Sequence, residues 1–160
     1  MTHARSAPQR WIRGSVAEAA ARRAHAPRLF LREDQRGFVD RKTGAISLQT
    51  ILLPIDGSVP YQDAYRWVAA FERLAGSIAR IHLLHVGTST PANASEFEGK
   101  IDVREGPVIE TIISVAKEIG ADIIAMPTAG RHGLFDALRG SVTERVLREA
   151  PCPVLAVPVM

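Results

Sequence analysis

The sequence predicts a doubly wound α/β fold with a mostly parallel, five-stranded sheet. From residue 49 onward, short apolar runs alternate with amphipathic stretches, which is the pattern of a parallel sheet covered by helices. A glycine-containing loop also follows one apolar run and leads into a charged amphipathic helix. The expected strands are 51–55, 81–86, 101–103, 123–126 and 154–157.

Three amphipathic stretches predict helices at 59–75, 107–119 and 141–149. Gly120 directly follows the second stretch and is the expected helix stop. The apolar face of the first helix is expected to consist of Tyr65, Val68, Ala69 and Leu74.

Two segments depart from a regular parallel sheet. Pro54 lies inside a buried-type strand, where it removes a ladder hydrogen bond, so we expect it to mark the strand's last turn or a bulge beside a site. Residues 87–100 form a crossover without helical periodicity, although such crossovers usually contain a helix. The crossover after the second strand is therefore expected to be reduced.

Composition narrows the class of protein further. The 160 residues are 46% hydrophobic, which suffices for one ordinary core. No apolar stretch approaches the roughly 18 to 20 residues that span a bilayer, and residues 1–5 lack a signal core, so we expect a cytoplasmic protein without membrane partners. The single cysteine, Cys152, fits a reducing compartment and is expected to be small buried filler.

The basic charge is confined to the N-terminal segment. Residues 1–48 contain 10 Lys and Arg against 4 Asp and Glu, which leaves 10 against 13 for residues 49–160. The arginines have no interleaved aromatic residues and no nucleic-acid-binding motif accompanies them. A solvated helix face and a linker are expected here rather than a nucleic-acid interface.

The candidate ligand site lies where ligands bind doubly wound sheets, beyond the carboxyl ends of the strands. Asp56 follows the first strand and could accept hydrogen bonds from a ribose or a base. Gly130, Gly133 and Gly140 follow the fourth strand and would let backbone amides approach phosphates, while Ser141 would add a hydroxyl at the start of the last helix. If the strand order is 3-2-1-4-5, these loops face one crevice.

Each of these residues also has an ordinary structural interpretation. Asp56 can end a strand with an Asx-turn, and Ser141 can form a capping box with Glu144. His132, inside the glycine loop, either contacts a phosphate or is solvated.

Other motifs of nucleotide and metal chemistry are absent from the sequence. It has neither the P-loop nor the dinucleotide glycine pattern, and no set of residues that supports catalysis. His82 and His85 are three residues apart on one strand and point to opposite faces, so they are poor joint metal ligands, and His85 is expected to be a core or rim histidine. We expect no catalytic residues and no metal site.

Several segments together resemble the universal stress protein family. The sequence ILLPIDGS at 51–58 resembles that family's first strand and its Pro-x-Asp-x-Ser turn. Residues 83–86 are similar to its second strand, 103–106 to its third strand and turn, and 140–157 to its final helix and strand. The resemblance covers residues 49–160.

This resemblance implies a flavodoxin-like or adenine nucleotide alpha-hydrolase-like, Rossmann-like sheet of order 3-2-1-4-5. It also implies a homodimer formed through the last strand, by Val154, Ala156, Val157 and Val159. In one branch of the family it implies ATP binding through glycines spaced G-x2-G-x9-G-[ST]. Here the spacing is Gly130-x2-Gly133-x6-Gly140-Ser141, which is three residues shorter.

Residues 13–31 repeat residues 139–157 without a gap, at a constant offset of 126. The first reads RGSVAEAAARRAHAPRLFL and the second RGSVTERVLREAPCPVLAV, with nine identities. Residues 1–48 therefore look like the last helix and strand of a preceding domain of the same family plus a linker, and residues 49–160 like a universal stress protein domain. The chain is interpreted as a tandem protein that lacks most of its first half, or as two convergent capped helices.

An isolated helix and short strand cannot bury their apolar faces alone. We expect the N-terminal pair to dock over sheet surface left bare by the reduced crossover, or to swap onto a second chain.

Two functions remain open from the sequence. The first is a regulatory stress-response module that binds ATP or AMP, with magnesium, in the crevice and hydrolyses ATP slowly at most. The second is a dimerising interaction module that binds no nucleotide and acts through protein partners. The shortened glycine loop favours the second function, and the retained Asp56, glycines and Ser141 favour the first.

Overall fold

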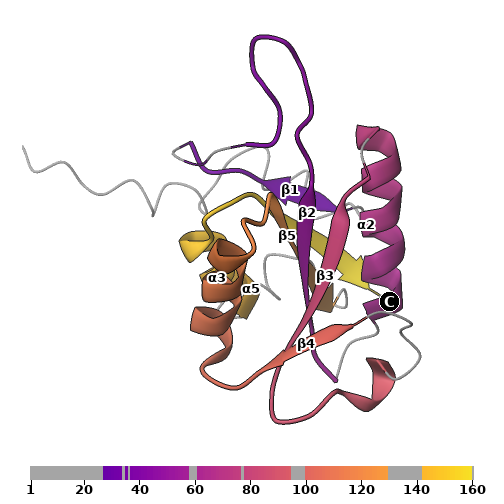
Figure 1. Ribbon diagram of the computed structural model, residues 1–160, viewed down its shortest axis with the longest axis vertical. Coiled ribbons are helices and arrows are strands. Elements are labelled where there is room, and N and C mark those ends of the chain that lie inside the picture. The colour runs from indigo at the N-terminus through magenta and orange to yellow at the C-terminus, as the bar shows by residue number, and fades with distance from the viewer. Residues whose placement is uncertain are drawn as a thin grey trace, which may run out of the picture.

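Six strands form one sheet in the computed structural model, in the order β1-β6-β5-β2-β3-β4 (Figure 1). The structure describes residues 27–33, 35, 37–57, 61–76, 78–94, 100–129 and 142–159. The strands are β1 (Arg28–Phe30), β2 (Thr50–Ile55), β3 (Arg80–Val86), β4 (Ile101–Arg104), β5 (Ile123–Ala129) and β6 (Val154–Val159). The five strands predicted after residue 49 are all present, and their predicted order is confirmed, with β1 added at the β6 edge.

Helices cover both faces of this sheet, as the doubly wound prediction requires (Figure 1). Their bounds are α2 (Tyr61–Ala75), α3 (Val108–Glu118) and α5 (Val142–Glu149). Consecutive strand residues point to opposite faces. Leu53 therefore belongs to the core under α2, and Leu52 to the core under α3 and α5, and both are fully buried.

The ends of α3 agree with the sequence prediction, whereas the buried face of α2 differs from it. Pro107 precedes α3, and Gly120, with a φ of 60°, ends it as predicted. The buried face of α2 consists of Tyr61, Ala64 and Val68. Tyr65 and Leu74, which were expected on that face, are 37% and 86% exposed, so the prediction was wrong for these two residues.

The connection from β3 to β4 contains little regular secondary structure in its described part. Its described part contains a single 3₁₀ turn, η2 (Ala92–Ala94), and residues 95–99 lie outside the described residues. The described part therefore agrees with the predicted reduction of this crossover.

Residues 38–48 are more ordered than a linker. Val39 bridges Ile46 in an antiparallel sense, and this turn projects from the body of the molecule (Figure 1). Phe38 packs edge-on against Phe71 of α2, with ring centroids 5.9 Å apart. Leu48 is 2% exposed and joins the core under α2. Phe38 and Leu48, which lie in the expected linker, thus contribute to the core of the domain at residues 49–160.

The N-terminal strand lies at an unexpected edge of the sheet. β1 pairs antiparallel with β6, at the end of the sheet opposite β4. The expectation that this strand covers sheet surface beside the reduced crossover is therefore wrong for β1. The predicted helix before it, and residues 1–26 as a whole, lie outside the described residues.

Cys152 is buried, as expected of filler. Burial, together with the nearby Asp122 carboxylate, raises the pKa of the Cys152 thiol to about 12. None of the helices in the described part of the chain is long and apolar enough to cross a membrane.

Candidate functional site

The winding of the sheet reverses between β2 and β5. From β2 the chain proceeds to β3 and β4 on one side, and then crosses to β5 and β6 on the other side. All four neighbouring pairs among these five strands are parallel, so their carboxyl ends meet at one edge. Such a reversal point is where open α/β sheets bind ligands.

The two strands at this reversal are paired only near their amino ends. The β2–β5 register joins Ile51 to Ile123 and Leu52 to Ile124, whereas β2 and β3 remain paired as far as Ile55. Pro54, which has no N–H to donate, lies just beyond the last β2–β5 pair. It sits inside a regular strand, so the expected bulge is absent, and it marks the place where β2 and β5 cease to pair.

Asp56 is exposed at the carboxyl end of β2, directly after this point. The following residue, Gly57, turns toward the β3–β4 connection, because a Cβ built on it would lie 3.8 Å from the Cβ of Pro91. Pro91 is buried, so the turn rests on a fixed part of the fold.

His85 lies next to this turn and is half-buried, which agrees with the expected core or rim position, although its contact with β2 was not predicted. Its Nδ1 is 3.0 Å from the carbonyl oxygen of Ile55. A carbonyl only accepts, so Nδ1 carries the proton and Nε2 is the acceptor of the neutral ring. A Cβ on Gly87 would lie 2.4 Å from Nε2, so only glycine at position 87 leaves room for this ring position. The register of His85 with Ile55 is the signal that could have placed it here.

On the other side of the crevice, β5 ends at Ala129 and α5 begins at Val142. Thr128 is buried, and its hydroxyl donates to the carbonyl of Val157, 3.1 Å away, which joins the ends of β5 and β6. The predicted phosphate-binding residues Gly130, Gly133, Gly140 and Ser141, together with His132, lie outside the described residues. Of this part of the predicted site, the structure describes only β5, which precedes the loop, and α5, which follows it.

The residues predicted for a dimer interface lie on β6. Val154, Ala156 and Val157 are buried, with at most 1% exposure. Val159 closes the strand, and its side chain is not described. Because β1 already pairs with β6, a homodimer through this edge requires β1 to move.

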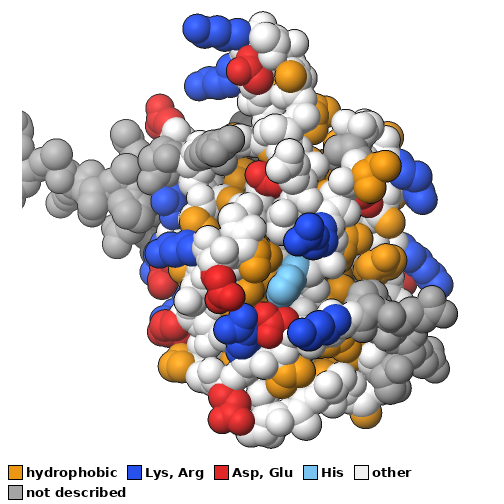
Figure 2. Space-filling model, in the orientation of Figure 1, with side chains coloured by type: hydrophobic (Ala, Val, Ile, Leu, Met, Phe, Trp, Pro, Cys, Tyr) orange, Lys and Arg blue, Asp and Glu red, His pale blue; other side chains and the backbone are white. Residues whose placement is uncertain are grey.

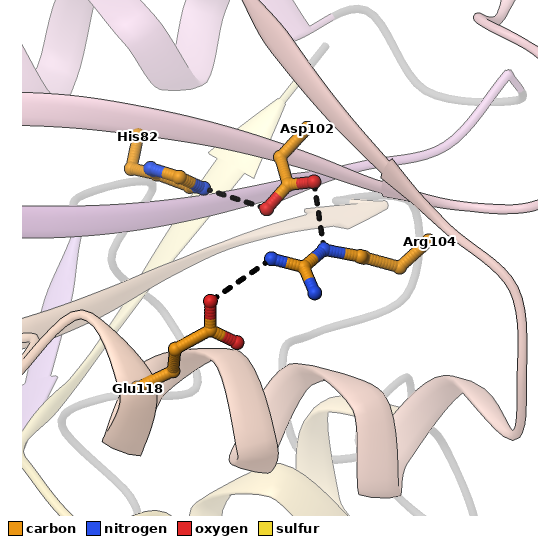
Figure 3. A network of polar contacts seen from close by, with 4 residues as sticks. All are labelled: His82, Asp102, Arg104 and Glu118. Atoms are coloured by element: carbon orange, nitrogen blue, oxygen red, sulfur yellow. Dashed lines mark hydrogen bonds and ion pairs between the residues drawn. The ribbon is translucent and has the colours of Figure 1, made fainter.

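A polar cluster lies away from the crevice, over β3, β4 and α3 (Figure 3). His82 Nε2 is 3.2 Å from one oxygen of Asp102, and Arg104 Nε donates to the other oxygen at 2.8 Å. Arg104 also contacts Glu118 at 3.0 Å, which ties the edge strand β4 to α3. Figure 2 shows charges of both signs gathered around a histidine on this face. Charged side chains protect an edge strand such as β4 from pairing with other chains.

Hydrogen bonding from Arg104, reinforced by His82, lowers the pKa of Asp102 despite partial burial. A lowered pKa in the folded state means that this carboxylate stabilises the fold above its unfolded pKa of about 4, and that the contribution is lost as the pH falls through the folded-state value. Asp102→Asn is expected to lower the free energy of unfolding at pH 7 by about 1 kcal/mol.

Urea denaturation as a function of pH measures this effect, and the difference between the two proteins should shrink below about pH 4. Asp63→Asn is the matched control, since Asp63 pairs with Arg66 on the surface of α2 and should change stability by less than about 0.5 kcal/mol. A constant difference between Asp102→Asn and the unmodified protein down to pH 2 would contradict the assignment.

Among the described residues, no group of three or more His, Cys, Asp or Glu side chains is arranged to hold a metal ion. The reversal point of the sheet offers an exposed carboxylate, Asp56, and a half-buried imidazole, His85. These groups can bind a polar ligand through hydrogen bonds.

Known proteins resemble this chain in both sequence and fold. Residues 88–158 match the profile described as "Universal stress protein family". A universal stress protein of Synechocystis sp. (strain PCC 6803) is 31% identical over 151 residues, covering 79% of this chain and 96% of that protein.

Two solved structures show the same fold. A universal stress protein from Archaeoglobus fulgidus has a TM-score of 0.64 at 21% identity and covers 92% of this chain, which spans only 55% of that structure's length. A universal stress protein family protein from Arabidopsis thaliana has a TM-score of 0.50 at 18% identity, covering 70% of this chain and 92% of that one. With a relative that is 31% identical and aligned over nearly its whole length, the chain belongs to the universal stress protein family.

Proposed function

We propose that this protein is a regulatory stress-response module that binds an adenine nucleotide, ATP or AMP, in the crevice between the loops after β2 and β5. The observation that carries the proposal is the end of the β2–β5 ladder before Pro54, at the reversal of the sheet, with Asp56 exposed beside it. Family membership supports the stress-response role.

The chemistry of the described half of the crevice fits the nucleoside part of such a ligand. The Asp56 carboxylate can accept hydrogen bonds from ribose hydroxyls or from an exocyclic base amine. The phosphates would lie against the loop of residues 130–141, whose three glycines allow close approach of backbone N–H groups. The Arabidopsis structure with the same fold is described as having AMP bound, which supports adenine nucleotides as the first ligands to test.

We propose no dedicated catalytic machinery, and slow ATP hydrolysis at most. Magnesium would accompany ATP through its phosphates. The protein would then respond to nucleotide levels rather than consume nucleotide at a metabolic rate.

Isothermal titration calorimetry with ATP and with AMP, each with and without magnesium, tests the proposal. Asp56→Ala should weaken binding by about ten- to a hundredfold, because it removes hydrogen bonds to a charged acceptor. Gly130→Val should abolish phosphate binding by placing a branched Cβ in the loop. Glu149→Ala, an exposed residue at the far end of α5, removes the same charge as Asp56→Ala and should bind like the unmodified protein.

A titration without heat for either nucleotide at millimolar concentration would overturn the nucleotide proposal. It would support the alternative function, a module that binds no nucleotide and acts through protein partners. The observation that favours this alternative is the distance from Gly133 to Gly140, which is three residues shorter than the ATP-binding spacing.

A further inference from the structure

Residues 38–47 form a β-hairpin, the projecting hairpin, which extends away from the sheet (Figure 1). It lies between β1 and β2, outside the residues 88–158 that match the family profile. The proposed nucleotide site does not use it. Neither the family match nor that site therefore explains why this segment is ordered.

The turn and the base of the projecting hairpin both stabilise it. In the turn, one carboxylate oxygen of Asp40 accepts from the backbone N–H groups of Lys42, at 2.9 Å, and Thr43, at 2.7 Å. Gly44, with a φ of 72°, adopts the left-handed conformation that glycine accommodates. At the base, Phe38 is 8% exposed and packs against α2. A preformed hairpin can bind a partner without the entropy loss of becoming ordered.

The middle of the projecting hairpin offers unpaired main-chain groups. Val39 and Ile46 lie opposite each other as an antiparallel pair. Main-chain hydrogen bonds of 2.7 and 2.8 Å join the two arms on either side of this pair, so the pair itself directs its N–H and C=O groups outward. Within the described part of the chain, neither Val39 nor Ile46 uses these groups in a hydrogen bond. Each edge of the hairpin can therefore accept an added strand.

The exposed side chains of the projecting hairpin are apolar in its middle and basic at its tip. Val39 is 44% exposed and Ile46 is 43% exposed, and as a cross-strand pair they share one face. Arg41 and Lys42 are exposed at the tip, and neither forms an ion pair with another described residue. Figure 2 shows basic side chains at the outer end of this projection. The hairpin thus presents main-chain, apolar and cationic groups together.

We propose that the projecting hairpin is a docking element for a partner protein, which adds an extended acidic segment to it as a third strand. The main chain of that segment pairs with the outward groups of Val39 or Ile46. Its apolar side chains lie against the exposed apolar pair, and its carboxylates lie near Arg41 and Lys42.

Other anionic partners fit these features less well. Nucleic-acid binding draws its affinity from several phosphate contacts, whereas the tip offers Arg41 and Lys42. A nucleic acid or an anionic lipid surface would also leave the outward main-chain groups without partners. An extended peptide segment uses the main-chain groups, the apolar pair and the cations at once.

Selection of short random peptides, displayed on phage, against the full-length chain tests the chemistry of the partner. Peptides that combine Asp or Glu with Val, Ile or Thr should be enriched. A synthetic peptide of the enriched sequence, labelled with fluorescein, is then the probe for anisotropy titrations. Enrichment of no peptide, or of neutral or basic peptides, would overturn the proposal.

Val39→Thr with Ile46→Thr tests strand addition on the apolar pair, because threonine keeps the β-branched shape and the strand propensity. This variant should bind the peptide about tenfold more weakly. Leu74→Thr changes an exposed apolar residue of α2 and should bind like the unmodified protein. In the complex, hydrogen exchange should slow at the N–H of Val39 or of Ile46. Unchanged affinity of the double variant, or unchanged exchange at both N–H groups, would overturn strand addition.

Arg41→Glu with Lys42→Glu tests the charge at the tip and should weaken binding of the same peptide by about tenfold. Arg73→Glu with Lys117→Glu makes the same change of charge at exposed positions of α2 and α3, and should bind like the unmodified protein. Equal weakening by both variants would overturn the assignment to the tip. Tighter binding of duplex DNA or of phosphatidylglycerol vesicles than of the peptide, lost in Arg41→Glu with Lys42→Glu, would overturn a protein as the partner.

Discussion

Replacing Leu53 by alanine is expected to lower the free energy of unfolding by about 3 kcal/mol, within the range of about 2 to 5 kcal/mol that buried leucines show. Leu53 is fully buried in β2, in the core that lies under α2. The loss combines the transfer of the removed methyl groups with the cavity left in a packed core. Urea denaturation followed by circular dichroism measures it.

Leu52→Ala is expected to cost about as much, because Leu52 is equally buried in the core on the opposite face, under α3 and α5. Leu74→Ala is the control, since Leu74 is 86% exposed and its replacement should change stability by no more than about 0.5 kcal/mol. If one of the two buried leucines proved neutral, the corresponding face of the sheet would not be covered as the doubly wound fold requires.

The order of β2 to β6 could be predicted because each strand coincides with a separate apolar run. Each helix between them shows apolar residues at helical spacing. The location of the reversal point followed from that order, since a reversal of winding determines which loops become neighbours. Asp56 was selected in this way; the structure has it exposed directly after β2, and its contact with a ligand stays a prediction.

The position of β1 could not be predicted from local pattern. The internal repeat identified the residues as a strand, but apolar alternation does not specify which sheet edge a strand joins. The pairing of Leu29 with Leu155 depends on how the two strands meet in the folded chain, which local pattern does not specify. His85 was assigned to a core or rim for a similar reason, because its role depends on the neighbouring carbonyl of Ile55.

Helical periodicity alone did not identify the residues of α2 that pack against the sheet. The pattern included Leu74, but the helix lies against the sheet through Tyr61, Ala64 and Val68. Trp67, Phe71 and Leu74 of this helix instead line a shallow apolar groove that Leu29 and Leu155 also line, so the residues of α2 face two surfaces. A period of 3.6 residues shows that a helix has an apolar side, and packing decides which part of that side is buried.

Asp122 is the residue through which the amino ends of β2 and β5 are joined most directly. Its Oδ2 accepts from the backbone N–H groups of Gln49, at 2.8 Å, and Thr50, at 3.0 Å. Its own N–H donates to the carbonyl of Thr50 at 2.9 Å. These bonds hold the two strands together at the end opposite the crevice, where the ladder between them is only two pairs long.

Asp122→Ala is therefore expected to lower the free energy of unfolding by about 2 to 3 kcal/mol, because two hydrogen bonds to a charged acceptor are lost. Asp122→Asn is the matched control, since its amide oxygen can accept from the same two N–H groups and should retain most of the stability. Hydrogen exchange localises the effect, with faster exchange expected at Gln49 and Thr50 in the alanine variant. A loss below about 0.5 kcal/mol for Asp122→Ala would show that the short ladder holds β2 and β5 together without this carboxylate.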